Sequence, residues 1–269
     1  VQTCALPILI LQILLQAISL GLSSLIVFNC TNKYDKEPNY KIIDFKGKIK
    51  LILSSLFIVF MLQLILSFII YPAIGLNYDT TDLFDIDSSS RMLSKVLLII
   101  ALAITPAIFE ELFFRKAVID FSIKYGKNFA LLFSALLFGL LHMNISQGLF
   151  AFLIGLILGL LYLYTGNIKI TMLIHFINNG FATLELILPD IGVLVTTATL
   201  LISLIAGLII IFKTISNKSS REKILSICKR KVSLSTISTK YKYIFADYTF
   251  DISLILLLFM SLLTERILR

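Results

Sequence analysis

The chain contains apolar runs that are too long for the core of a soluble domain. The first run, Leu6 to Phe28, holds no charged residue, and about 18–20 such residues suffice for an α-helix to cross a bilayer. Hydrophobic residues make up 58% of the sequence and charged residues only 15%, whereas a soluble domain carries about a quarter as charges. We therefore expect an all-α, polytopic transmembrane helical bundle.

Eight apolar segments can be placed along the sequence, so we expect about eight spans. The first is too long for a signal-peptide core and has no basic residue before it. The last is short, with Glu265 and Arg266 close behind it. The segments are Ala5–Phe28, Ile49–Leu76, Met92–Val118, Phe129–Asn144, Gly148–Tyr164, Ile168–Leu188, Ile191–Phe212 and Phe250–Leu263.

The loops between these segments alternate between basic and non-basic. Counted with the adjoining segment ends, the first loop has six lysines, the third has Arg115, Lys116, Lys124 and Lys127, the fifth has Lys169, and the seventh is again rich in Lys and Arg. The second loop is acidic over most of its length, and the fourth and sixth lack basic residues. The positive-inside rule then predicts an external amino terminus and cytoplasmic odd-numbered loops.

This charge pattern also explains the net charge of +8 without nucleic acid, which we do not expect as a partner. The expected partner is the lipid bilayer of a cell membrane. We predict a single integral membrane domain over residues 1–269, with a motif-bearing catalytic core at 92–188 and a basic cytoplasmic loop at 213–249. The three cysteines show no spacing typical of a disulfide framework or a thiolate metal site. The oligomeric state stays open.

Ionisable residues inside apolar segments are costly, and several together indicate a function. The third segment contains Glu110, Glu111 and Arg115, the fourth ends near His142, and the sixth contains His175. A lone histidine on an apolar face is most often a packing residue. Here both histidines of the chain fall into spans that accompany a pair of carboxylates, which favours a functional site.

Helical spacing divides the two carboxylates. Glu111 and Arg115 are four residues apart and share a helix face, so we expect them to pair. The Glu110 side chain points about 100° around the helix from that of Glu111 and does not face Arg115. Glu110 is therefore free to act as a general base. Pro106 removes a helix hydrogen bond one turn earlier and predicts a kink near this point.

Two further pairs have the same spacing of four residues. His175 and Asn179 share a face, and their nitrogens could together hold a developing oxyanion. Phe138 and His142 place an aromatic ring one turn from an imidazole, although ordinary packing explains a phenylalanine equally well.

The three elements Glu110-Glu111-x-x-x-Arg115, Phe138-x-x-x-His142 and His175-x-x-x-Asn179 occur in this order on three spans. In this respect the sequence resembles the CPBP family of intramembrane endopeptidases, also called the Abi family, which includes CAAX prenyl proteases and bacteriocin-processing proteins. The resemblance covers residues 105–180. One departure is Lys116, where family members often have glycine.

The resemblance implies hydrolysis of a peptide bond within the membrane. On this basis Glu110 and His142 would activate the attacking water, and His175 and Asn179 would stabilise the oxyanion. Glu111 with Arg115, and Phe138 beside them, would support the site.

The resemblance leaves the cofactor open, because the family has been described both as metal-dependent and as a metal-free glutamate protease. If a divalent metal such as zinc is present, its ligands would be Glu110, His142 and His175, which is an acceptable set of zinc ligands. The sequence has no HExxH motif, so the expectation leans toward metal-free chemistry.

The substrate class is also open between a lipidated, CAAX-like peptide and a bacteriocin- or leader-type peptide. The Ile-, Leu-, Lys- and Asn-rich composition favours a bacterial source and the second class. Alternative functions are a proton-coupled transporter, in which the buried groups form a relay, and a non-catalytic immunity or scaffold protein of the same fold.

The expected span boundaries place Glu110 and His142 at different depths in the membrane, which conflicts with their belonging to one site. With these boundaries Glu110 and His142 would differ in depth by on the order of 10 Å. Either the third helix extends beyond the bilayer, or the fourth begins later than Phe129.

Overall fold

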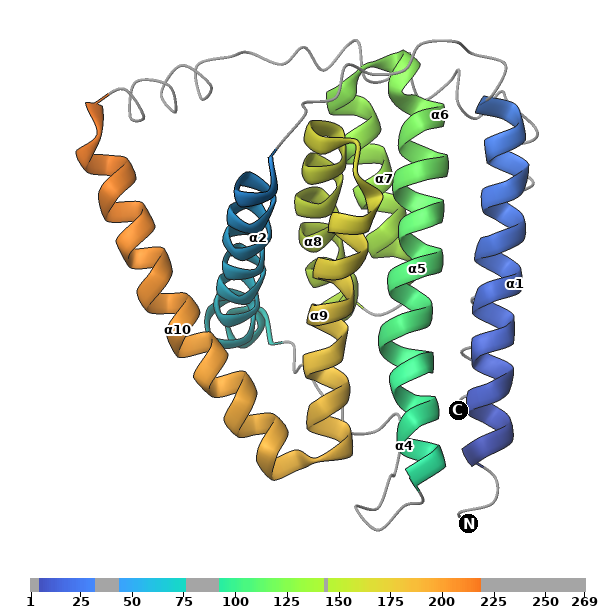
Figure 1. Cartoon of the computed structure of the whole chain (residues 1–269), viewed down its shortest axis with the longest axis horizontal. Coiled ribbons are helices and arrows are strands. Elements are labelled where there is room, and N and C mark those ends of the chain that lie inside the picture. The colour runs from blue at the N-terminus through green and yellow to red at the C-terminus, as the bar shows by residue number, and fades with distance from the viewer. Residues whose placement is uncertain (1–4, 32–43, 76–91, 143–144, 219–269) are drawn as a thin grey trace.

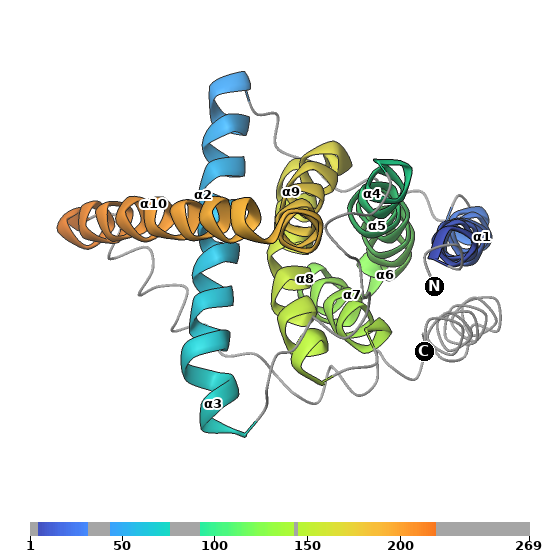
Figure 2. The same cartoon turned by 90° about the horizontal axis from the view of Figure 1, so that it is seen from below.

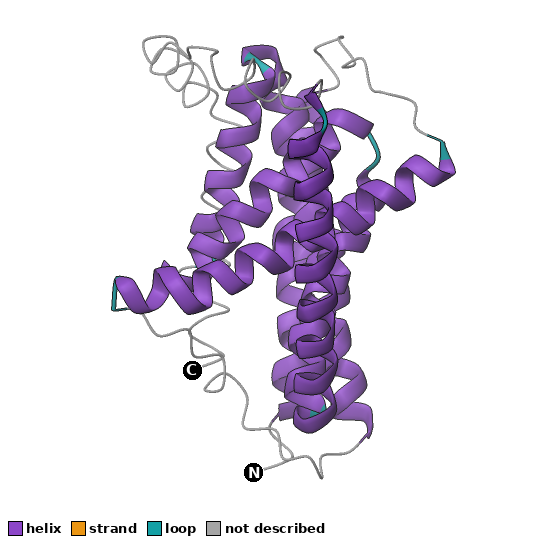
Figure 3. Ribbon diagram, turned by 90° about the vertical axis from the view of Figure 1, so that its left-hand side faces the viewer, coloured by secondary structure: helices purple, strands orange, loops and turns teal. Residues whose placement is uncertain are grey.

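A computed structural model of the chain describes residues 5–31, 44–75, 92–142 and 145–218. These residues form helices joined by short turns, and no strand occurs among them (Figure 3). The long helices are α1 (Ala5–Thr31), α2 (Phe45–Ile65), α7 (Lys127–Leu141), α8 (Ile145–Thr165), α9 (Ile168–Ile187) and α10 (Pro189–Ser216). The second and third spans also contain wider, π-helical turns and short pieces.

In the second span, α2 continues through η1 (Leu66–Ile70) into α3 (Tyr71–Ala73). The third span is built from six successive pieces. These are α4 (Met92–Ile99), η3 (Ile100–Ile104), α5 (Thr105–Glu111), η4 (Leu112–Ile119), α6 (Asp120–Ser122) and η5 (Ile123–Tyr125).

The polytopic helical bundle expected from the sequence is confirmed. Six helices of the described residues are long and apolar enough to cross a membrane, and a shorter apolar helix, Lys127–Leu141, accompanies them. Seven of the eight expected segments therefore correspond to helices, while the eighth, Phe250–Leu263, lies outside the described residues, as does most of the basic loop 213–249. The chain is an integral membrane protein.

The third span is longer than expected. It runs from Met92 to Tyr125, 34 residues, instead of ending at Val118, and at about 1.5 Å per residue it exceeds the ~30 Å hydrocarbon core. Assigning Arg115 and Lys116 to a loop was therefore wrong. Arg115 is fully buried within the helix, and Lys116 extends outward to an ion pair with Asp120 (2.8 Å).

This extension removes the depth conflict. The turn between the third span and α7 is Gly126, whose φ of 113° favours glycine. Glu110 lies 16 residues before Gly126 and His142 lies 16 residues after it. Two antiparallel helices of equal length on either side of one turn bring both residues to the same depth.

The spans are arranged side by side, with α1 at one margin next to the third span and α2 and α10 at the other (Figures 1 and 2). The third span, α7, α8 and α9 lie between these margins. A second left-handed glycine, Gly166 with φ 64°, reverses the chain between α8 and α9. The Asn167 side chain then accepts a hydrogen bond from the Lys169 N–H (3.1 Å) and caps α9.

Helices α7 and α8 are packed closely at glycines. A Cβ added to Gly139 would stand 2.8 Å from the Gly148 carbonyl oxygen, and one added to Gly155 would stand 3.2 Å from the Ala135 Cα. Small residues that let helix backbones approach are typical of membrane helix pairs. This contact holds Phe138, near the end of α7, in the apolar core with Phe113 and Phe114 of the third span.

Candidate active site

Glu111 and Arg115 form a buried ion pair within the third span. Arg115 donates from Nε to Glu111 Oε2 (3.0 Å) and from Nη2 to Glu111 Oε1 (3.2 Å). Neither side chain is exposed. The guanidinium carbon also lies 4.9 Å from the centroid of the Phe138 ring. The predicted pair is therefore present, as a two-point contact that neutralises the Glu111 charge.

His175 joins this pair from α9. Its Nδ1 lies 3.1 Å from Glu111 Oε1, and a carboxylate held by arginine can only accept, so Nδ1 carries the proton. Its Nε2 lies 3.3 Å from the Asn179 Nδ2, which can only donate. Neutral His175 is thus fixed with Nδ1–H as donor and Nε2 as acceptor.

Asn179 connects α9 to the proline kink of the third span. Its Nδ2 donates to the Leu102 carbonyl (3.2 Å). In a regular helix the N–H of residue 106 would satisfy that carbonyl, but Pro106 has none. The proline therefore bends the helix and also leaves the Leu102 carbonyl oxygen to accept the hydrogen bond that orients the Asn179 amide.

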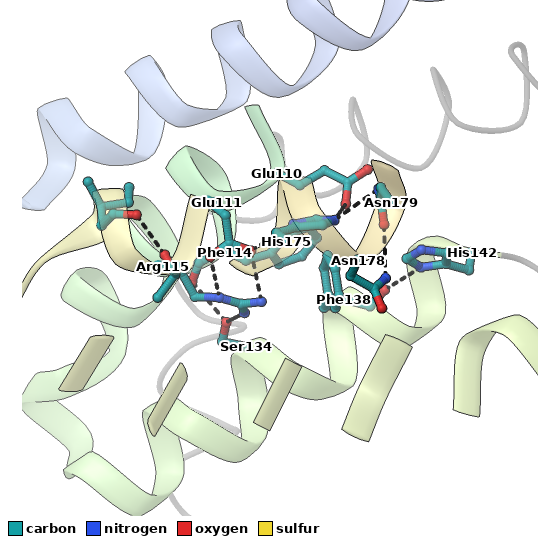
Figure 4. Close-up of polar contacts among 12 residues, drawn as sticks. Glu110, Glu111, Phe114, Arg115, Ser134, Phe138, His142, His175, Asn178 and Asn179 are labelled. Carbon is teal, nitrogen blue, oxygen red and sulfur yellow. Dashed lines mark hydrogen bonds and ion pairs between the residues drawn. The ribbon is translucent and has the colours of Figure 1, made fainter. Parts of the chain in front are cut away.

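Glu110 has different neighbours from Glu111. Its Oε2 lies 3.8 Å from His175 Nε2, which is too long for a hydrogen bond, and it has no hydrogen-bond partner among the described residues. The side chain is buried, with 9% of its surface exposed. Figure 4 shows its carboxyl turned toward the side of His175 that also faces Asn179. The sequence-based division into one paired and one unpaired carboxylate therefore holds in the structure.

Phe138 stands between the two imidazoles. Its ring centroid lies 5.3 Å from that of His142 and 5.7 Å from that of His175, edge to face in both cases (Figure 4). His142 itself follows the last residue of α7, and its Nδ1 lies 2.9 Å from the Phe138 carbonyl oxygen. A carbonyl only accepts, so Nδ1 carries the proton and Nε2 keeps its lone pair.

Two side chains that the sequence analysis did not select complete the hydrogen bonds of this cluster. Ser134 of α7 accepts from Arg115 Nη1 (3.2 Å) and donates to the Phe114 carbonyl (2.8 Å). Asn178 donates to Asn179 Oδ1 (3.1 Å). A signal was present in both cases, since Ser134 is a polar residue in an apolar span and Asn178 adjoins a motif residue.

The metal site considered from the sequence has no geometric support in the described part of the chain. No three His, Cys, Asp or Glu side chains there are gathered so that they could hold a metal ion. The Phe138 ring stands between the two imidazoles, with its centroid 5.3 Å from that of His142 and 5.7 Å from that of His175.

Comparison with known families gives one match. Residues 92–181 match the model of a family described as type II CAAX prenyl endopeptidase Rce1-like. The resemblance to the CPBP family is confirmed. The matched residues carry all three motifs and extend somewhat beyond the 105–180 expected from the motifs alone. No curated protein and no solved structure matches the chain.

At the level of this family, the match supports a CAAX-type intramembrane protease, that is, a hydrolase acting on a peptide in the bilayer. The segment that matches is also the segment that contains the ion pair, both histidines and Asn179. The family match and the polar cluster thus cover the same part of the molecule.

Proposed function

We propose that the chain is an intramembrane endopeptidase in which Glu110 and His142 activate water for attack on a peptide bond. The observation that carries this proposal is the division of the two adjacent carboxylates. Glu111 is held by Arg115, Ser134 supports the arginine, and Glu110 Oε2 is buried without a hydrogen-bond donor. A buried acceptor without a donor is a suitable position for a water molecule that must lose a proton.

His142 is a suitable second acceptor for the proton of that water. Its Nδ1–H is engaged by the Phe138 carbonyl, so the lone pair lies on Nε2, as a general base requires. Phe138, whose role the sequence left open between packing and support, fixes this tautomer through its backbone and separates the two imidazoles through its ring.

His175 and Asn179 are proposed to stabilise the oxyanion. In the neutral state the Asn179 amide donates to Leu102 and faces His175 Nε2, so His175 offers no proton on that side. We propose that the proton which Glu110 takes from the water moves on to His175 Nε2, 3.8 Å from Glu110 Oε2, while the oxyanion forms. The His175 Nε2–H then becomes a donor to the developing oxyanion, and Glu111 stabilises the imidazolium from the other side.

The proposed reaction is balanced as follows. Water transfers one proton to Glu110 with the aid of His142, and its oxygen bonds to the carbonyl carbon of the substrate. The tetrahedral oxyanion receives hydrogen bonds from His175 and Asn179. When the C–N bond breaks, the same proton returns from His175 through Glu110 to the leaving amine, and a new carboxyl terminus is released.

For the substrate we propose a membrane-associated peptide, either lipidated and CAAX-like or of the bacteriocin leader type. The composition favours a bacterial cell membrane and the second class. The ends of the loops expected to be basic support the proposed orientation. The carboxyl ends of α1 and α10, the connection from α6 to α7 and the turn from α8 to α9 lie on one side of the bundle (Figure 1). We propose that this side is cytoplasmic.

The proposal is tested by incubating the purified full chain in lipid nanodiscs with a farnesylated CAAX peptide and with a leader-bearing peptide. Mass spectrometry then identifies products, with the Glu110→Ala variant as the inactive control. We expect cleavage of one class by the wild type and none by the variant. Equal cleavage by both would exclude Glu110 as the base.

Two further results discriminate the alternatives. Absence of cleavage of either peptide, combined with pH-driven uptake of a solute into proteoliposomes, would favour the transporter. Cleavage that is lost in a chelator and restored by zinc would contradict the metal-free mechanism without contradicting the protease.

A further inference from the structure

Buried oxygens that lack a hydrogen-bond donor are concentrated at one helix contact. Among the described residues they are Gln12 Oε1, Gln16 Oε1, Glu110 Oε2 and Thr196 Oγ1. The first two belong to α1 and the third to α5, and these two helices pack against each other. Gln12 is 94% buried, with 6% of its surface exposed. Three of the four oxygens therefore lie on one pair of helices.

The contacts of α1 place both glutamines alongside the third span, with Gln16 nearer the level of Glu110. Leu9 packs in one cluster with Leu98 and Ala101, and a Cβ on Gly21 would stand 3.6 Å from the Phe109 ring. The two helices thus run in the same direction, and Gln12 and Gln16 lie between these two levels. At 1.5 Å per residue, Gln16 comes within roughly 10 Å of Glu110 along the axis.

The chemistry of these oxygens specifies what they lack. An amide oxygen accepts hydrogen bonds, and its burial in a membrane helix without a donor is costly. Hydrocarbon chains of lipids have no N–H or O–H groups to offer. The backbone of an extended peptide does, because every second N–H points to the same side.

The spacing of the two glutamines fits such a backbone. Four residues along a helix rise about 6 Å, so Gln12 and Gln16 share a face and are separated by that distance. Alternate residues of an extended chain are about 6.6–6.8 Å apart. Two successive donors of one peptide edge can therefore reach the two amide oxygens at the same time.

We propose that Gln12 and Gln16 accept hydrogen bonds from alternate backbone N–H groups of the peptide substrate. The peptide lies extended along α1 and carries its scissile bond toward Glu110. Main-chain hydrogen bonds select a substrate by its extended backbone conformation and do not select particular side chains. The inference rests on the proposed protease function and assigns to α1, which lies outside the matched residues 92–181, the role of positioning the substrate.

The first test compares the variants Gln12→Leu and Gln16→Leu with Gln63→Leu, a matched control at a partly buried position of α2. We expect each α1 variant to raise KM about fivefold, the effect of one lost neutral hydrogen bond. The value of kcat should stay unchanged, because this binding is uniform between ground and transition state. The control should leave both constants unchanged. Equal KM values in all three variants would overturn the inference.

The second test uses substrate peptides that are N-methylated at one backbone position at a time. At the position that donates to Gln16, methylation should raise KM for the wild type and have little further effect in Gln16→Leu. This coupling would not arise if the glutamine only stabilised the helix bundle. A lower kcat in the variants without any coupling to N-methylation would indicate a bound water instead and would contradict the proposal.

Binding without cleavage separates the inference from the function. The inactive Glu110→Gln variant is mixed with a peptide that carries a photo-crosslinking residue, and crosslinks are located by mass spectrometry. Crosslinks in residues 5–31, with no cleavage by the wild type, would support peptide binding at α1 and contradict the proposed protease function. Cleavage by the wild type with no crosslink to α1 would overturn the inference alone.

Discussion

Arg115 is a fully buried guanidinium in an apolar span, and its hydrogen bonds come from two helices. Glu111 supplies both carboxylate oxygens from the same helix, and Ser134 supplies a hydroxyl from α7. A buried ion pair contributes little net stability, but removal of one of its contacts is costly since a charge then lacks a partner. We therefore expect the small Ser134 side chain to contribute substantially to the free energy of unfolding.

This expectation is tested by Ser134→Ala. The variant leaves one Arg115 N–H and the Phe114 carbonyl without their partner, and we expect a loss of about 1–3 kcal/mol in the free energy of unfolding. The matched control is Ser122→Ala, because Ser122 is equally buried but donates only to carbonyls of its own helix. Thermal unfolding in detergent measures both. Equal melting temperatures for the two variants would contradict this role of Ser134.

At the scale of the helix, Pro106 links the shape of the third span to the orientation of Asn179. The proline leaves the Leu102 carbonyl without its helical donor, and the Asn179 amide takes that place. The π-helical turns on either side, η3 and η4, are typical of helices that carry functional residues. The kink is therefore part of the site.

Pro106→Ala is expected to restore a backbone N–H that competes with Asn179 for the Leu102 carbonyl. We predict an unchanged or higher melting temperature together with a kcat lowered about tenfold or more, in keeping with a misplaced oxyanion donor. The control Pro72→Ala lies in α3 and should leave kcat unchanged. An active Pro106→Ala variant with wild-type kcat would show that the proline only bends the helix.

The α7–α8 pair sets the position of Phe138 and His142, and glycine makes the approach possible. Gly139→Ala would place a methyl group 2.8 Å from the Gly148 carbonyl oxygen, whereas a Cβ on Gly180 of α9 meets nothing within 4 Å. We predict that Gly139→Ala destabilises the protein by about 1–3 kcal/mol, while Gly180→Ala is neutral or stabilising. Thermal unfolding of both variants decides this, and equal destabilisation would contradict the packing account.

For the whole molecule, hydropathy and spacing were sufficient for the fold class and for the contacts within one helix. The Glu111–Arg115 pair could be predicted because both residues share a helix face. Contacts between helices could not, since the side that α9 turns toward the third span depends on packing. The hydrogen bonds of Ser134 to Arg115 and of Asn179 to Leu102 belong to this second kind.

The error at the end of the third span has a similar physical cause. Arg115 and Lys116 were counted among the charges of the following loop, yet one is neutralised inside the helix and the other reaches solvent from it. Because the span continues to Tyr125, Glu110 and His142 lie 16 residues before and after the single turn at Gly126. The site therefore depends on the length of a whole span as well as on its motifs.

The central claim is that Glu110 acts on the substrate while Glu111 holds the site together. It is tested by measuring peptide cleavage and thermal unfolding for the wild type, Glu110→Gln and Glu111→Gln. We predict that Glu110→Gln folds like the wild type but loses about 10²–10⁴-fold in kcat, the usual contribution of a general base. Glu111→Gln should be destabilised by about 3–5 kcal/mol, because Arg115 is left as a buried unpaired charge. Wild-type cleavage by Glu110→Gln would contradict the account.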